Sequence, residues 1–119
     1  MSRDRRTLIA NAGCASFWIG TFSSEEELET FINSAAFENE QGFIIESPLL
    51  PFHAYEPHVE PRGLLSKLMR DPRMVDAAMK KLPKIAFNAL IRHDGFRYNP
   101  SAAPRRKRRM VFLGTFRRR

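Results

Sequence analysis

The chain has 119 residues, of which 43% are hydrophobic, and its formal net charge is +7. This length suits a single domain that buries about two-thirds of the surface exposed by its unfolded form. One cysteine, Cys14, excludes an internal disulfide and argues against a structural zinc site. The three histidines, His53, His58 and His93, lack partner cysteines and a His-x-x-x-His spacing, so we expect no metal and no cofactor.

The charge is unevenly distributed along the chain. Residues 1–60 hold 3 basic and 10 acidic residues, a net charge of −7, whereas residues 61–119 hold 17 and 3, a net charge of +14. Such a split favours an electrostatically oriented encounter with a charged partner. For any single stretch, the alternative is that its charges lie on a solvated helix face and serve no partner.

The first residues combine three arginines with a short apolar run at residues 7–10. This run is shorter than the roughly 7 to 15 apolar residues of an export signal. No stretch approaches the roughly 20 apolar residues of a membrane span. We therefore expect a cytoplasmic protein without membrane contact, in which residues 1–14 form a flexible leader, residues 15–116 the domain and residues 117–119 a basic tail.

Two short runs near opposite ends of the chain nearly repeat one another. Trp18–Phe22 and Phe112–Phe116 share the pattern aromatic, aliphatic, Gly, Thr, Phe. Each is uncharged and rich in aromatic and β-branched residues, which predicts a buried strand, and its glycine indicates a bulge or a close backbone approach. If the two strands pair, nearly the whole chain is one unit; a chance match between unrelated strands is the alternative.

A helix is predicted over about residues 24–36. Ser23 fits the N-cap because Glu26 follows three positions later, as in a capping box. The apolar residues that form one helical face are Leu28, Phe31, Ile32 and Ala35. The outer face carries Glu25, Glu26 and Glu29, which we interpret as a solubilising surface.

Residues 37–61 are interrupted by four prolines, which exclude a long strand or helix there. A short strand at residues 42–46 is the one element expected in this loop-rich segment. Two short helices then follow, with apolar stripes over residues 64–69 and 74–82. Asp71-Pro72 separates them, because proline fits the first turn of a helix.

The last third of the chain predicts strands. Residues 85–92 form one strand, Asp94-Gly95 a turn, and residues 96–98 the start of another strand. A polar connection at residues 99–109 leads to the last strand at residues 110–116. The expected fold class is α+β: a single-domain antiparallel sheet of about four strands, with about three helices packed mainly on one face.

Five adjacent cations precede the last strand: Arg105, Arg106, Lys107, Arg108 and Arg109. Such a run can neutralise phosphates and give salt-dependent nucleic-acid binding, but phosphate contacts carry no sequence selectivity. A flexible solvated loop is the alternative. The sequence contains no nucleophile elbow, phosphate loop or His-Glu-x-x-His motif, and we expect no enzymatic activity.

The segment Tyr55–Glu60 combines an aromatic residue with two carboxylates on a loop stiffened by Pro57. A rigid loop loses little entropy on association, so this composition favours a protein-binding surface. The alternative is a plain loop in which Tyr55 packs on the core while Glu56 and Glu60 face water.

Four motifs in this order resemble the immunity protein 22 family, small proteins encoded beside the polymorphic toxins of bacteria. The similarity spans about residues 16–116. The matching segments are Phe17–Phe22 with Ser24–Leu28, then Tyr55–Glu60, then Asn88–Ile91 with Phe96–Tyr98, and finally Phe112–Phe116.

The resemblance implies inhibition by binding: the protein would dock on a cognate toxin domain, such as a nuclease, and block its active site. Its acidic half is then the expected interface, because an acidic inhibitor can mimic phosphate. The residues expected there are Glu38, Glu40, Glu46, Tyr55, Glu56 and Glu60. Those expected to be structural are Trp18, Gly20, Phe22, Asn88, Tyr98, Gly114 and Phe116. The alternative function is nucleic-acid binding through Arg105–Arg109 and the C-terminal tail.

Overall fold

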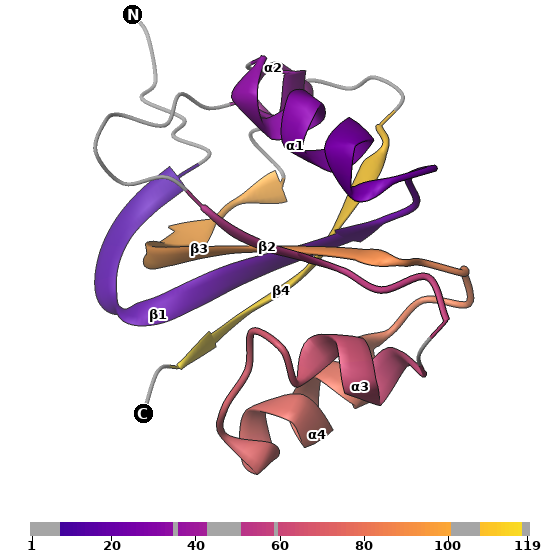
Figure 1. The fold of residues 1–119 in the computed structure, drawn as a ribbon. Helices are drawn as coiled ribbons and strands as arrows, with labels where there is room; N and C mark the ends of the chain where they lie inside the picture. The colour runs from indigo at the N-terminus through magenta and orange to yellow at the C-terminus, as the bar shows by residue number, and fades with distance from the viewer. Residues whose placement is uncertain (1–7, 35, 43–50, 59, 101–107, 118–119) are drawn as a thin grey trace, which may run out of the picture.

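The fold was analysed in a computed structural model that describes residues 8–34, 36–42, 51–58, 60–100 and 108–117. The elements, in chain order, are β1 (Leu8–Gly20), α1 (Glu25–Asn33), α2 (Ala36–Gln41), β2 (Phe52–Tyr55), α3 (Pro61–Leu65), α4 (Pro72–Lys81), β3 (Ala89–Tyr98) and β4 (Met110–Arg117). The four strands form one antiparallel sheet in the order β2-β3-β1-β4 (Figure 1). The predicted α+β class is therefore confirmed.

The two similar runs at the chain ends pair with each other. In the β1–β4 register Trp18 lies opposite Phe112 and Phe17 opposite Gly114. A side chain at Gly20 would collide with the Met110 sulfur, and its Cβ would lie 2.8 Å from the Arg109 carbonyl oxygen. The predicted pairing is confirmed, and the glycine of β1 marks a close backbone approach.

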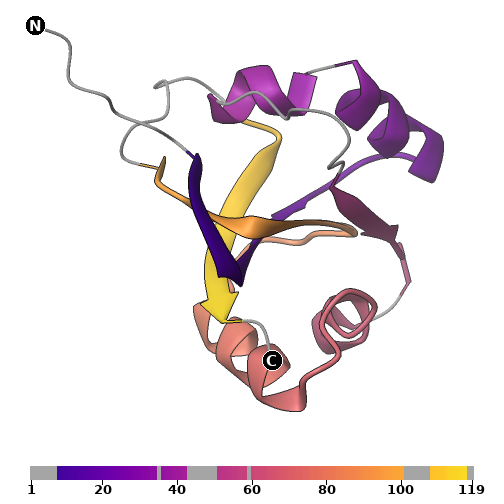
Figure 2. The same ribbon diagram turned by 90° about the vertical axis from the view of Figure 1, so that its left-hand side faces the viewer.

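The helices lie on both faces of the sheet, which corrects the prediction that they pack mainly on one. Figures 1 and 2 show α1 and α2 on one side and α3 and α4 on the other. Successive residues of β1 point to opposite faces, so Phe17 and Ile19 join the core under α3 and α4, while Trp18 joins the core under α1 and α2. The sheet is thus the middle layer of three.

The first predicted helix is divided into two. Its N-cap is Ser24, not Ser23: the Ser24 hydroxyl accepts a hydrogen bond from the Glu27 N–H at 3.1 Å. The Glu27 carboxylate reaches back to the Ser23 N–H at 2.7 Å. α1 ends at Asn33 and α2 begins at Ala36, so the predicted stripe over residues 24–36 covers α1 and the start of α2.

The strands also differ from the prediction in their bounds. β3 runs unbroken through Asp94-Gly95, where a turn was predicted, because Gly95 adopts a φ of 83° opposite a bulge at residues 11–14 of β1. β1 begins at Leu8, so residues 8–14 belong to the sheet and not to a leader. In the predicted strand at residues 42–46, Gly42 follows α2, and residues 43–46 lie outside the described residues.

His93 of β3 is buried, with 2% of its surface exposed, and its ring lies 4.9 Å from that of Phe96. Burial lowers the pKa of His93, and the charge of Asp94 only partly opposes this shift. The unfolded chain therefore binds a proton more readily, so the free energy of unfolding decreases as the pH falls below about 6.5. We expect the variant His93→Gln to show a smaller decrease between pH 7 and 5 in urea unfolding, and equal decreases in both proteins would contradict this assignment.

Candidate functional site

β2 is an edge strand of the sheet (Figure 1). Its side chains alternate between the two helical layers. Ala54 enters the core under α3 and α4, and Tyr55 packs against the core under α1. Phe52 is 57% exposed, which makes it the most exposed large hydrophobic side chain of the described residues. The edge at β2 therefore presents an aromatic side chain to solvent.

Hydrogen bonds anchor the end of β2 and the residue that follows it to the domain. The Tyr55 hydroxyl lies 3.5 Å from the Phe22 carbonyl oxygen, and the Glu56 N–H donates to the Asn88 carbonyl oxygen at 2.9 Å. The Glu56 carboxylate pairs with the Lys67 ammonium at 3.1 Å. Glu60 is exposed and immediately precedes α3. Two carboxylates are thus presented on a segment anchored at β2 and at α3.

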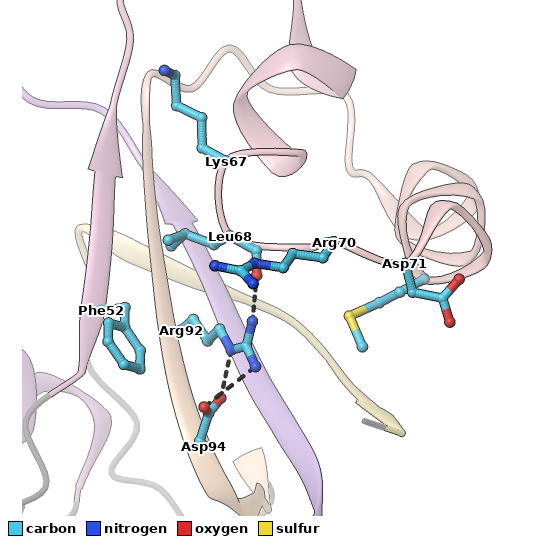
Figure 3. A pocket seen from close by; sticks show the side chains of 8 residues that line it. Phe52, Lys67, Leu68, Arg70, Asp71, Arg92 and Asp94 are labelled. Atoms are coloured by element: carbon cyan, nitrogen blue, oxygen red, sulfur yellow. Dashed lines mark hydrogen bonds and ion pairs between the residues drawn. The ribbon is translucent and has the colours of Figure 1, made fainter. Parts of the chain in front are cut away.

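A cavity of about 360 Å³ opens beside Phe52, between β2 and the connection from α3 to α4 (Figure 3). Its floor is formed by Arg92, which donates to both carboxylate oxygens of Asp94 and to the Leu68 carbonyl oxygen. The lining residues are Phe52, Lys67, Leu68, Arg70, Asp71, Met74, Arg92 and Asp94.

The chemistry of this lining suits binding. Its polar side chains are the charged groups of lysine, arginine and aspartate. Asp71 caps α4 through the Arg73 N–H at 2.9 Å, and Asp94 is engaged by Arg92. The cavity can therefore receive a side chain from a partner, with the Lys67 and Arg70 side chains beside it.

The acidic residues of α2 lie elsewhere and are used differently. The Glu40 carboxylate accepts hydrogen bonds from the backbone N–H groups of Arg109 and Met110, both at 2.7 Å. Glu40 therefore holds α2 against the start of β4, at the opposite edge of the sheet from β2. Glu38 is half-buried on the same helix, and Glu46 lies outside the described residues. The described members of the predicted interface thus separate into two groups.

The basic run before β4 is described only at its end, because residues 105–107 lie outside the described residues. The guanidinium of Arg109 lies 4.1 Å from the centre of the Phe22 ring and 3.1 Å from a Glu27 carboxylate oxygen. It also donates to the Thr21 carbonyl oxygen. Hydrogen bonds from Ser23 and then Arg109 lower the pKa of Glu27. Arg109, which directly precedes β4, therefore links the start of this strand to α1.

Sequence reasoning did not identify the neighbours of His53. Its imidazole Nε2 lies 3.4 Å from a carboxylate oxygen of Glu29 and 4.0 Å from one of Glu25. The two glutamates occur one turn apart on α1, which is distant in sequence from β2. A search of helical His-x-x-x-His patterns could not find this group, since its members come from two elements.

Comparison with known proteins gave no assignment: no family model matches the chain, and searches of curated proteins and of solved structures returned no match. None of the helices in the described part of the chain is long and apolar enough to cross a membrane.

Proposed function

We propose that this protein is an immunity protein that binds a cognate toxin domain and neutralises it by covering its active site. The observation that carries the proposal is the β2 edge surface, which we define as Phe52, Tyr55, Glu56 and Glu60. It combines an exposed aromatic residue with two carboxylates on an anchored segment. In this proposal the protein acts in the cytoplasm, and it inhibits by binding without catalysing a reaction.

Physical considerations favour this surface as a docking site. Tyr55 and Glu56 are held by hydrogen bonds in the free protein, so ordering them on association costs less conformational entropy than ordering an unanchored loop. Phe52 supplies the kind of aromatic contact that often contributes most to binding free energy, beside a cavity that can receive a partner side chain. Glu56 is paired with Lys67, so the exposed carboxylate of Glu60 would contribute most to a faster encounter with a basic toxin surface.

Nucleic-acid binding remains the alternative expectation for Arg105, Arg106, Lys107, Arg108 and Arg109. Arg109 is engaged by Glu27 and Phe22 and would have to leave them to contact phosphate. A binding assay over a range of salt concentrations, with and without this basic run, distinguishes the two functions. Micromolar or tighter binding that needs the run and weakens by orders of magnitude with salt would favour nucleic acid.

We expect Glu60→Lys to weaken binding to the toxin domain encoded beside this gene by about tenfold or more, chiefly through slower association at low salt. The matched control is Glu26→Lys on α1, since both glutamates are exposed and the charge change is the same.

Phe52→Ala should weaken binding through faster dissociation, because truncating a central aromatic residue typically costs about 1–2 kcal/mol or more.

Surface plasmon resonance at two salt concentrations measures both rate constants. Equal effects of the two lysine substitutions would show that the partner does not dock at the β2 edge surface. Absence of an adjacent toxin gene, or equal death of cells that co-express toxin with and without this protein, would overturn the function itself.

A further inference from the structure

We propose that Glu25, Glu29 and His53 form a binding site for a divalent transition-metal ion of the Zn²⁺ type. The two carboxylates project from successive turns of α1, and the imidazole projects from β2 towards them. One ligand atom from each side chain lies within 4.8 Å of the other two. Three protein ligands leave a further coordination position for water.

The two distances from His53 suit such an ion, one as it stands and one after a small adjustment. A tetrahedral ion with bonds of about 2.0–2.2 Å holds its ligand atoms about 3.3–3.6 Å apart. The His53 Nε2 to Glu29 oxygen distance of 3.4 Å already meets this requirement, and the Glu25 oxygen at 4.0 Å must approach by a few tenths of an ångström. Both glutamate side chains are about half exposed, at 60% and 49%, so they have room to do so.

The negative charge of the two carboxylates also favours a cation at this position. The other ion pairs of the described residues all join a carboxylate to arginine or lysine: Glu27 with Arg109, Glu56 with Lys67, Asp71 with Arg73, Asp76 with Arg62, and Asp94 with Arg92. Among the described residues, Glu25 and Glu29 form ion pairs with His53 alone. Like charges one helical turn apart repel, and a bound cation would relieve this repulsion.

The ligand chemistry selects the class of ion. An imidazole nitrogen with carboxylate oxygens suits zinc and its neighbours in the first transition series, whereas calcium and magnesium prefer sites made of oxygen alone. Binding would link α1 directly to the edge strand β2.

The test is calorimetric titration of the full chain with Zn²⁺ at neutral pH, using Cys14→Ser as the reference protein so that the thiol cannot bind the metal. We expect one ion per chain, and at least a tenfold loss of affinity in both His53→Ala and Glu29→Gln. The matched controls His58→Ala and Glu26→Gln, which change the same residue types outside the cluster, should bind as the reference does. Mg²⁺ at equal concentration should not compete.

A parallel readout is thermal unfolding. Zn²⁺ should raise the Tm of the reference protein and of both controls, and should leave the Tm of His53→Ala unchanged, because metal binding stabilises only the folded state that holds the site. Equal affinity in the reference protein and His53→Ala, or no binding up to millimolar Zn²⁺, would overturn the proposal. Neither result would bear on toxin binding, which is measured separately.

Discussion

Replacing Trp18 with alanine should lower the free energy of unfolding by about 4 kcal/mol, within the range usual for removing a large buried aromatic side chain. Trp18 is fully buried near the C-terminal end of β1. Its ring lies 5.1 Å from those of Phe37 and Tyr98 and 5.5 Å from that of Phe112, measured between centroids. The substitution therefore removes contacts with α2, β3 and β4 at once, and urea unfolding measures its effect.

The variant Trp18→Phe separates packing from hydrogen bonding. The Trp18 indole donates to the buried Gln41 side chain at 3.1 Å, and the Gln41 amide donates in turn to the Met110 carbonyl oxygen at 2.8 Å. Phenylalanine keeps an aromatic ring but leaves the Gln41 oxygen without this donor, so we expect an intermediate loss of about 2 kcal/mol. A loss below about 1 kcal/mol for Trp18→Ala would show that the core under α1 and α2 contributes little to stability.

Replacing Asn88 with alanine should lower the free energy of unfolding by about 2–3 kcal/mol, because it removes two hydrogen bonds and leaves the Phe22 N–H without its acceptor. The Asn88 side chain accepts from the Phe22 N–H at 2.9 Å and donates to the Phe22 carbonyl oxygen at 2.8 Å. Strand pairing of β1 ends at Gly20, and the Asn88 side chain supplies hydrogen bonds to the backbone two residues further on.

The variant Asn88→Asp is a near-isosteric test of this interpretation. It keeps the acceptor but places a second oxygen against the Phe22 carbonyl, so it should destabilise at least as much as alanine does. The control is Asn39→Ala, since Asn39 is exposed on α2 and its replacement should change stability by less than about 0.5 kcal/mol. Equal stability of Asn88→Asp and the original chain in chemical unfolding would rule out the donated hydrogen bond.

Local patterns in the sequence were sufficient for much of the fold. The uncharged runs around Gly20 and Gly114 predicted two strands, and Pro72 predicted the start of α4. The placement of the helices was wrong because Phe17–Ile19 and Leu90–Ile91 are continuous apolar runs. Such runs are typical of strands covered on both faces, whereas an alternating pattern indicates one covered face.

The candidate site was predictable only where its residues are neighbours in the chain. The local composition predicted a binding surface at Tyr55, Glu56 and Glu60, which lie in one short segment. The contacts of Glu56 with Lys67 and of Tyr55 with Phe22 join residues that are distant in sequence. The exposure of Phe52 depends on the position of β2 at the sheet edge, which no local pattern specifies. The role of Glu40 likewise depends on the distant backbone of β4 and could not be read from its surroundings in sequence.

The three-layer arrangement has a consequence for cooperativity. β1 supplies side chains to the hydrophobic clusters on both sides of the sheet. Loss of either helix pair would therefore expose one face of β1, the strand on which the other helix pair also packs. We therefore expect neither pair of helices to remain folded without the other, and the whole chain to unfold in one cooperative transition.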